Sequence, residues 1–291
     1  MNQFVQQMTK IIMPYAKSKA SLLTQHGKES IICPELMKTN GLEVIHVSDF
    51  DTDQLGTFTR ETPRFGSQLE AARKKARIGM ELARTSIGIA SEGAFSNDPV
   101  TGLVPWNYEL VILIDDVRKI EILGICSGPA QSAHKEVSSW DELIIFLSAA
   151  NFPTHQLVVR PDDENHPICR KEVHDHYSLR ESFDWAMNLS KNRKVFVEND
   201  LRAHTNPTRM ANIEKATKNL AFKLNSICPK CDSPGFGIAK QKAGLPCSCC
   251  ELPTDLPIAN IWTCVNCQCI KEEAIEFDKK ADPSKCNHCN P

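Results

Sequence analysis

Four short cysteine pairs in the last third of the chain decide how its C-terminal part folds. They are Cys228-Pro-Lys-Cys231, Cys247-Ser-Cys-Cys250, Cys264-Val-Asn-Cys267 and Cys286-Asn-His-Cys289. Two thiolates separated by two residues can turn back on one metal ion, and a second pair roughly fifteen to twenty residues later completes the tetrahedron. We therefore predict a double zinc ribbon with two structural zinc ions.

The spacing does not decide which pairs share an ion. We expect consecutive pairs to do so, with an interleaved arrangement as the alternative. The first expected site holds Cys228, Cys231, Cys247 and Cys250, and the second holds Cys264, Cys267, Cys286 and Cys289. Four thiolates leave no position for a substrate, so this zinc supplies folding free energy and is not catalytic. Cys249 and Cys269 remain, each as a packed thiol or as a substitute ligand.

The distribution of cysteines separates this segment from the rest of the chain. Thirteen cysteines are present, and ten of them follow residue 225. Redox Cys-x-x-Cys motifs occur singly in a βαβ context, so four such pairs in a row indicate metal binding. We divide the chain into an N-terminal extension (1–19), an α/β domain (20–225) and the zinc module (226–291). The extension is amphipathic and lacks arginine, which favours a plain extension over an organelle presequence.

Composition and charge narrow the choice of partners. The formal net charge is −2, and no apolar run is long enough for a membrane helix or resembles a signal peptide. We therefore expect a cytoplasmic protein with no membrane partner. The zinc module carries seven lysines, no arginine and eight acidic residues, so it lacks the basic face that nucleic-acid ribbons need. A protein partner or a purely structural role is favoured for it.

Hydrophobic periodicity before the zinc module alternates between strands and helices, which predicts an α/β domain. The expected strands are 21–24, 42–47, 87–91, 109–115, 119–123, 156–160 and 194–198. One helix is expected to start near Lys28, and others to cover 67–84, 139–150, 179–190 and 207–224. Asn206 followed by Pro207 predicts the start of the last helix. No GxGxxG, P-loop or Gly-x-Ser-x-Gly motif is present.

Three polar segments of this domain are candidates for ligand binding. They are Thr24-Gln-His-Gly-Lys28-Glu29, the loop 51–61, and Glu198-Asn-Asp-Leu-Arg202-Ala-His204-Thr-Asn-Pro-Thr-Arg209. In the first, a glycine would let the backbone approach an anion at a helix N-terminus, although an ordinary turn with a solvated lysine has the same pattern. The loop 51–61 is equally consistent with a binding loop or a plain surface loop. In the third, two arginines and a histidine favour anion recognition.

Two acidic positions complete the candidate set. Glu92 ends a predicted internal strand, which is where open α/β sheets place groups that handle ligands. Glu70 lies one helical turn before Lys74, and this spacing also fits a plain exposed ion pair.

At these residues the chain resembles two families. From His26 through Phe50-Asp-Thr-Asp-Gln-Leu-Gly-Thr-Phe-Thr-Arg60, then Arg202-Ala-His204, and on to the cysteines, it looks like an uncharacterised, mainly bacterial family of unknown function. More distantly, its first two thirds resembles the inosine/xanthosine triphosphate pyrophosphatase superfamily. Thr24 and Lys28 match a phosphate-binding turn, Glu70-Ala-Ala-Arg-Lys-Lys75-Ala matches a helix motif, and Ala90-Ser-Glu92-Gly matches an acidic strand end.

The second resemblance implies a mixed-sheet, ITPase-like fold and a metal-dependent hydrolase of nucleoside triphosphates, including non-canonical purine nucleotides. It implies that Glu92 and Glu70 carry Mg²⁺ or orient water, and that Lys75, Lys28 and Arg209 neutralise phosphate charge. Thr24, His26, Arg60, Arg202 and His204 complete the expected set of phosphate-binding residues. The chain departs from the motifs where the helix asparagine is Ala71 and where the strand end has one acid instead of two. The competing hypothesis is a non-catalytic nucleotide sensor whose zinc ribbons dock a protein.

Overall fold

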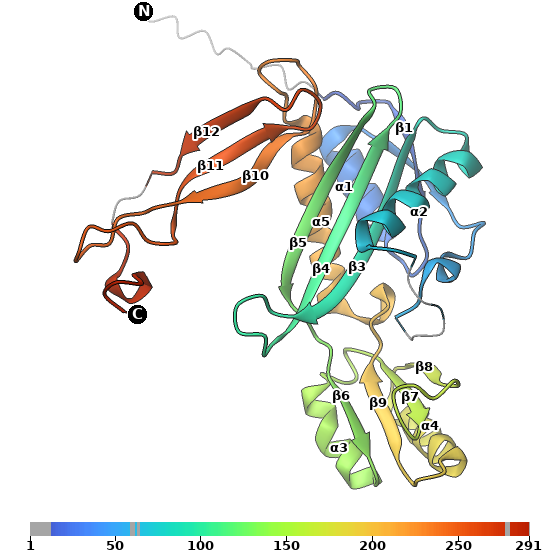
Figure 1. Cartoon of the computed structure of the whole chain (residues 1–291). Helices are drawn as coiled ribbons and strands as arrows, with labels where there is room; N and C mark the ends of the chain where they lie inside the picture. The colour runs from blue at the N-terminus through green and yellow to red at the C-terminus, as the bar shows by residue number, and fades with distance from the viewer. Residues whose placement is uncertain (1–12, 59–61, 63–64, 277–279, 291) are drawn as a thin grey trace, which may run out of the picture. The chain divides into compact units, whose positions relative to one another are not determined.

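The computed structural model describes residues 13–58, 62, 65–276 and 280–290, so most of the predicted N-terminal extension lies outside the described residues. The chain divides into two compact units, Ala16–Ala221 and a second that includes Phe222–Pro291. The boundary falls inside helix α5 (Pro207–Asn225). Both units are drawn in Figure 1.

A five-stranded mixed sheet forms the centre of the first unit, with strand order β2-β1-β3-β4-β5. Its strands are β1 (Lys19–Leu23), β2 (Glu43–Val47), β3 (Ile87–Asn97), β4 (Pro105–Asp115) and β5 (Ile120–Pro129). Strand β1 is parallel to both β2 and β3, whereas β3, β4 and β5 form an antiparallel meander. The predicted α/β class with a mixed sheet is confirmed.

Two helices cross over between the parallel strands on opposite faces of this sheet. Helix α1 (Glu29–Asn40) connects β1 to β2, and α2 (Gln68–Ala83) connects β2 to β3 (Figure 1). On the α2 face, Ala72 and Ala76 pack near Ala90 in one apolar cluster. On the other face, Asn40 Nδ2 donates to Ala221 O at 2.9 Å, which ties α1 to α5. Crossovers on opposite faces open a crevice at the carboxyl ends of the strands between them.

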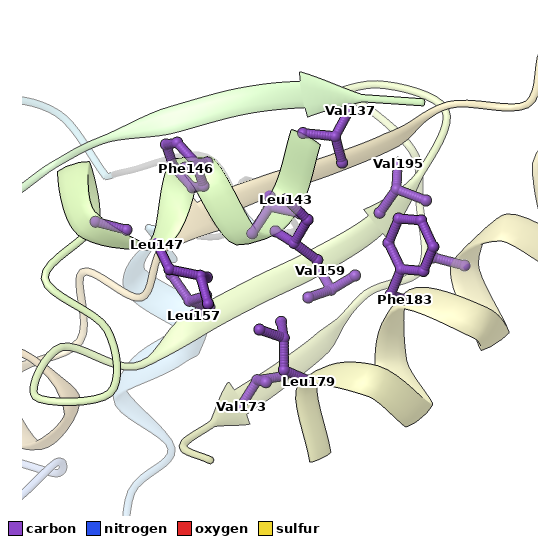
Figure 2. Close-up of a cluster of buried hydrophobic side chains, with 13 residues drawn as sticks. Val137, Leu143, Phe146, Leu147, Leu157, Val159, Val173, Leu179, Phe183 and Val195 are labelled. Carbon is purple, nitrogen blue, oxygen red and sulfur yellow. The ribbon is translucent and has the colours of Figure 1, made fainter. Parts of the chain in front are cut away.

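A second sheet of the same unit has the order β6-β9-β7-β8 and is entirely antiparallel. Its strands are β6 (His134–Val137), β7 (Leu157–Pro161), β8 (Arg170–Val173) and β9 (Val195–Asn199). Helices α3 (Trp140–Ala149) and α4 (His176–Leu189) cover one face, where Leu143, Val159 and Phe183 belong to a continuous apolar core (Figure 2). Strands β6 and β8 were not predicted, because they are short, polar and mostly exposed.

After β9 the chain passes through a short 3-10 turn (Ala203–Thr205) into α5. Asn206 Oδ1 accepts a hydrogen bond from Arg209 N at 3.0 Å, so the predicted start of this helix is confirmed. The helix brings Arg209 back towards the first sheet, whose strand β4 supplies its ion-pair partner.

The second unit is built on a three-stranded antiparallel sheet of β10 (Phe236–Ala243), β11 (Pro257–Cys264) and β12 (Ile270–Ala274). Short segments before, between and after these strands carry the cysteine pairs. Nowhere in the described residues is there a helix of the length and apolarity needed to cross a membrane.

Candidate functional site

Two groups of four cysteines lie in the second unit, each compact enough to hold one metal ion. The first group is Cys228, Cys231, Cys264 and Cys267, and the second is Cys247, Cys250, Cys286 and Cys289. The expected pairing of consecutive motifs is wrong, and the interleaved alternative is right. The antiparallel pairing of β10 with β11 explains this, because it brings the start of β10 beside Cys264 at the end of β11.

The sulfur positions fit tetrahedral zinc. Four sulfurs about 2.3 Å from one zinc ion are about 3.8 Å from one another. In the first group Cys228 Sγ lies 3.7 Å from Cys267 Sγ, and Cys231 Sγ lies 3.7 Å from Cys264 Sγ. In the second group the corresponding distances are 3.9 Å and 3.6 Å. The donor set and its size therefore suit two structural zinc ions.

Backbone amides around the sulfurs support the same conclusion. Lys230 N donates to Cys228 Sγ, Asn266 N to Cys264 Sγ, and Cys249 N to Cys247 Sγ, each at 3.4 Å. Such hydrogen bonds stabilise thiolates and orient metal ligands. Cys249 and Cys269 belong to neither group; Cys249 is exposed, and Cys269 is partly buried against the first group.

A polar pocket in the first unit gathers most of the candidate residues of the α/β domain. We call it the Lys28 pocket. Its lining residues are Thr24, Gln25, His26, Lys28, Thr52, Gly56, Thr57, Phe58, Lys75, Glu92, Arg202 and Arg209. The pocket is small and open to solvent, and the empty space in it and in its mouth together is about 480 Å³. It lies beyond the carboxyl end of β1, at the crevice between β1 and β3.

The turn between β1 and α1 forms one wall. His26 and Gly27 both have positive φ angles, 69° and 76°, so the chain reverses sharply before the helix begins. Glycine adopts this conformation without strain. Helix α1 has no side-chain cap at Lys28, so its N-terminus remains suited to an anion. Gln25 Oε1 accepts from Thr52 Oγ1 at 2.9 Å and thereby fastens the loop on the opposite wall.

Strand β1 pairs with the start of β3, Ser21 with Gly88 and Leu22 with Ile89, so β3 continues beyond the end of β1. Lys28 Nζ donates to the carbonyl oxygen of Ser91 in this part of β3, at 3.3 Å. Burial and the neighbouring charges of Arg209 and Lys75 lower the pKa of Lys28 to about 7.

Helix α2 contributes Lys75, which forms a close ion pair with Glu92 of β3. Both side chains are nearly buried. The predicted carboxylate Glu70 does not line the pocket. It is exposed and forms a capping box, in which Ser67 N donates to Glu70 Oε2 at 2.8 Å. Lys74 lies over the Phe65 ring, with Nζ 3.7 Å from the ring centroid.

Helix α5 contributes Arg209, whose Nε lies 2.7 Å from Glu109 Oε1. Both residues are buried, with 2% and 0% of their surface exposed. A Cβ on Gly93, which pairs with Glu109 across the sheet, would collide with both side chains, so this pair requires glycine. Sequence reasoning missed Glu109, because a lone acid inside an apolar strand indicates neither a face nor a partner.

Arg209 also has an unused hydrogen-bonding group. Its Cζ lies 4.4 Å from the Phe58 ring centroid, while its Nη2 is buried and has no hydrogen-bond partner among the described residues. A buried guanidinium nitrogen without a partner is rare, and it suits an anionic ligand.

The segment after β9 forms the rim. Arg202 is held by Asp200 through Nη2 and Oδ2 at 2.6 Å, and by Glu172 at 3.0 Å. His204 Nε2 lies 3.2 Å from Glu172 Oε1. The His204 ring stacks on His26, with centroids 5.2 Å apart. The hydrogen bond from His204 and the charge of Arg202 lower the pKa of Glu172.

The structure thus brings together seven predicted residues from four segments: Thr24, His26, Lys28, Lys75, Glu92, Arg202 and Arg209. His204 touches this group through His26, Glu70 lies apart from it, and Arg60 lies outside the described residues.

A family model described as a domain of unknown function (DUF6671) matches residues 75–291. The match includes Lys75, Glu92, Arg202, Arg209 and both cysteine groups, and it begins after the turn that carries Lys28. No curated protein and no solved structure matches the chain significantly. Since the matched region is most of its length, the chain belongs to the DUF6671 family.

Proposed function

We propose that the Lys28 pocket binds a nucleoside triphosphate or a related phosphorylated small molecule and, with Mg²⁺, hydrolyses it. Lys28, Lys75, Arg202 and Arg209 come from three separate segments and line a single small pocket. Three of these cations have carboxylate partners, but within the described residues Lys28 has no ion pair and Arg209 Nη2 has no hydrogen-bond partner, so the pocket favours an anionic ligand.

Phosphate is the anion that this arrangement suits best. The uncapped N-terminus of α1, the Lys28 ammonium and the unused Nη2 of Arg209 offer donors of three kinds. Arginine pairs with phosphate through its fork of N–H groups, lysine adds a point charge, and a helix N-terminus adds backbone amides. Phe58 gives the pocket one apolar wall, as a site for an organic phosphate would need.

The balance of charge supports a requirement for a metal. Carboxylates accompany three of the cations: Glu92 beside Lys75, Glu109 beside Arg209, and Asp200 with Glu172 around Arg202. Four carboxylates offset four cations, so a triphosphate would be poorly neutralised if it entered alone. A triphosphate that carries Mg²⁺ brings its own counter-charge.

The side chains of the Lys28 pocket suit a metal ion that is held mainly by the substrate. Outside the two cysteine groups, no three histidine or acidic side chains of the described residues lie close enough together to hold an ion. Mg²⁺ is commonly bound by one or two carboxylates, water and substrate phosphates. The chemistry that Mg²⁺ would supply is polarisation of phosphate oxygens.

The chain's own residues have separate roles in this reaction. Water attacks phosphorus while the opposite P–O bond breaks, and negative charge develops on the phosphate oxygens. Lys28 and Arg209 would stabilise this charge, and Glu92, held in place by Lys75, would orient the attacking water. The resemblance to the inosine/xanthosine triphosphate pyrophosphatase superfamily supports the same assignment of Glu92 and Lys28.

The test is to incubate zinc-loaded protein with Mg²⁺ and a panel of standard and deaminated-base nucleoside triphosphates. Released phosphate and pyrophosphate are measured, with Glu92→Gln beside Glu81→Gln, an exposed position on α2, as the control. Product released by the wild type and the control, but not by Glu92→Gln, is the expected result, and its identity shows which bond breaks. No product from any nucleotide would reject hydrolysis.

The second candidate is a non-catalytic nucleotide sensor, whose zinc ribbons dock a protein partner. The ion pair between Lys75 and Glu92 favours it, because a carboxylate engaged by an ammonium is less available to a metal ion or to water. A sensor would bind nucleotides in calorimetry without turnover, and Glu92→Gln would leave that binding in place.

A further inference from the structure

Lys28 differs from the three other cations of its pocket in having no carboxylate of its own. Lys75, Arg202 and Arg209 each form an ion pair, whereas the interaction of Lys28 within the described residues is a hydrogen bond from Nζ to the Ser91 carbonyl oxygen, 3.3 Å away. Only 5% of Lys28 is exposed. A buried ammonium without an opposite charge is costly, and in practice such a group loses its proton.

The charges that face Lys28 come from four elements, and they do not offset the cost of burying its ammonium. Arg209 of α5 and Lys75 of α2 are positive, while Glu92 of β3 and Glu109 of β4 are negative. Each of these carboxylates is already paired with one of these cations. Burial is the largest influence and lowers the pKa of Lys28 to about 7, so above neutral pH most molecules hold Lys28 uncharged.

A second unused donor lies in the same pocket. Arg209 Nη2 is buried and has no hydrogen-bond partner among the described residues. Arg209 is also the charged neighbour with the largest effect on Lys28. One oxyanion between the two would pair with the ammonium and accept from the guanidinium.

We propose that a doubly charged tetrahedral oxyanion, such as the terminal phosphate of a ligand, completes the Lys28 pocket and binds together with one proton, which Lys28 takes up. This inference rests on the anion-binding half of the proposed function and is independent of hydrolysis. The proton goes to the Nζ lone pair and converts the neutral amine into the ammonium that the anion needs.

The direction of the pH dependence follows from this linkage. Below pH 7 Lys28 is already protonated, and its contribution to affinity is complete. As the pH rises above 7, binding has to bring a proton from solution, so the affinity falls. The dissociation constant should rise by up to about tenfold per pH unit until the pKa of Lys28 in the complex is reached.

Inorganic sulfate is the probe, because it keeps two charges throughout this pH range and releases or takes up no proton itself. Calorimetric titration of the full-length, zinc-loaded protein at pH 8, in two buffers of different ionisation enthalpy, counts the protons taken up on binding. We expect about one proton per sulfate for the wild type. Lys38→Arg, an exposed position on the same helix, is the matched control and should give the same count.

Lys28→Arg provides the decisive comparison, because arginine stays protonated at every pH used. We expect it to bind sulfate with no proton uptake and with an affinity that changes little between pH 6.5 and 9. Proton uptake equal to that of the wild type would overturn the assignment to Lys28. The pH dependence of the wild-type dissociation constant tests the same idea if this variant does not fold.

The two proposals fail in different ways. Sulfate binding by the wild type without proton uptake overturns this inference alone and leaves the anion site standing. Absence of binding by sulfate, phosphate and tripolyphosphate at any pH overturns both. Binding with proton uptake but no nucleotide turnover rejects the hydrolase and supports this inference.

Discussion

The cysteine groups and the Lys28 pocket are built in opposite ways. Each cysteine group consists of two local pairs whose ligand type is plain from the sequence, and the fold decides only which pairs meet. The pocket consists of single residues at positions 28, 75, 92, 202 and 209, each unremarkable in its own stretch of chain. Each cysteine group has the donors and the size to hold one metal ion, whereas the pocket depends on the packing of α1, α2 and α5 around β3.

This difference shows which kind of site can be predicted from a sequence. A Cys-x-x-Cys pair carries its geometry with it, because two residues of separation already direct both sulfurs to one point. A buried lysine or arginine carries no such information, since its partner comes from another strand or helix.

The largest expected effect is the loss of zinc from double cysteine variants, which distinguishes the interleaved pairing from the consecutive one. In the interleaved arrangement Cys228 and Cys264 serve the same ion, so the double variant Cys228→Ser/Cys264→Ser should retain one zinc of two. Cys228→Ser/Cys247→Ser should retain none, and its second unit should unfold, because structural zinc supplies on the order of 10 kcal/mol to such modules. Zinc is counted by elemental analysis of purified protein. Cys249→Ser is the control and should keep both ions; the opposite result for the two double variants would restore the consecutive pairing.

The second prediction tests whether the buried Lys28 lowers the stability of the folded protein. Lys28→Met should raise the free energy of unfolding in buffer without phosphate or sulfate, since it removes a buried amine whose pKa is lowered to about 7. The unfolded state binds more protons than the folded state between pH 7 and the usual lysine range, so wild-type stability rises with pH there. The gain from Lys28→Met should therefore be larger at pH 6, up to about 5 kcal/mol, than at pH 9, about 2 kcal/mol.

Urea unfolding at the two pH values measures this gain. Lys38→Met, an exposed position near the end of α1, should show little change at either pH. A loss of stability in Lys28→Met would mean that the lysine is well compensated in the folded protein.

A smaller effect is expected at Gly93. The added methyl group of Gly93→Ala would collide with Arg209 and Glu109 and move them, at a cost of about 1–3 kcal/mol. Affinity for tripolyphosphate should fall at least tenfold, because Arg209 loses its position. Gly128→Ala is the matched control on β5, where an added Cβ meets no atom within 4 Å. Unchanged affinity in Gly93→Ala would show that Arg209 does not contact the ligand.

The smallest effect concerns Glu70. Because Glu70 caps α2 and does not line the pocket, Glu70→Ala should cost about 1 kcal/mol of stability and leave ligand affinity unchanged. Thermal unfolding and tripolyphosphate titration measure the two quantities, with Glu81→Ala on the same helix as the control. A folded Glu70→Ala protein that has lost binding or turnover would instead support the role that the family resemblance implies.

Much of the α/β unit could be predicted, because hydrophobic periodicity and helix caps act over a few residues. The strands around Ile89, Val111 and Val159 and all five helices were located in this way. The expected strands 87–91 and 109–115 are the inner halves of a longer hairpin. Its turn depends on Asp98, whose side chain accepts from Thr101 N at 2.7 Å and from Val104 N at 2.9 Å. In the sequence, a single aspartate in a loop that contains proline and glycine does not predict this turn.

The sequence by itself determined the cysteine ligands of the two metal-binding groups, the α/β class, and three of the segments that line the Lys28 pocket. Tertiary structure alone decided that the cysteine pairs interleave, that Glu109 holds Arg209, that Glu70 caps a helix, and that Lys28 is buried without a carboxylate. The physical reason is the range of the interactions. Metal-ligand spacing, capping and periodicity are satisfied within one or two turns of chain, whereas ion pairing and burial depend on neighbours that strand order and helix packing bring from distant positions.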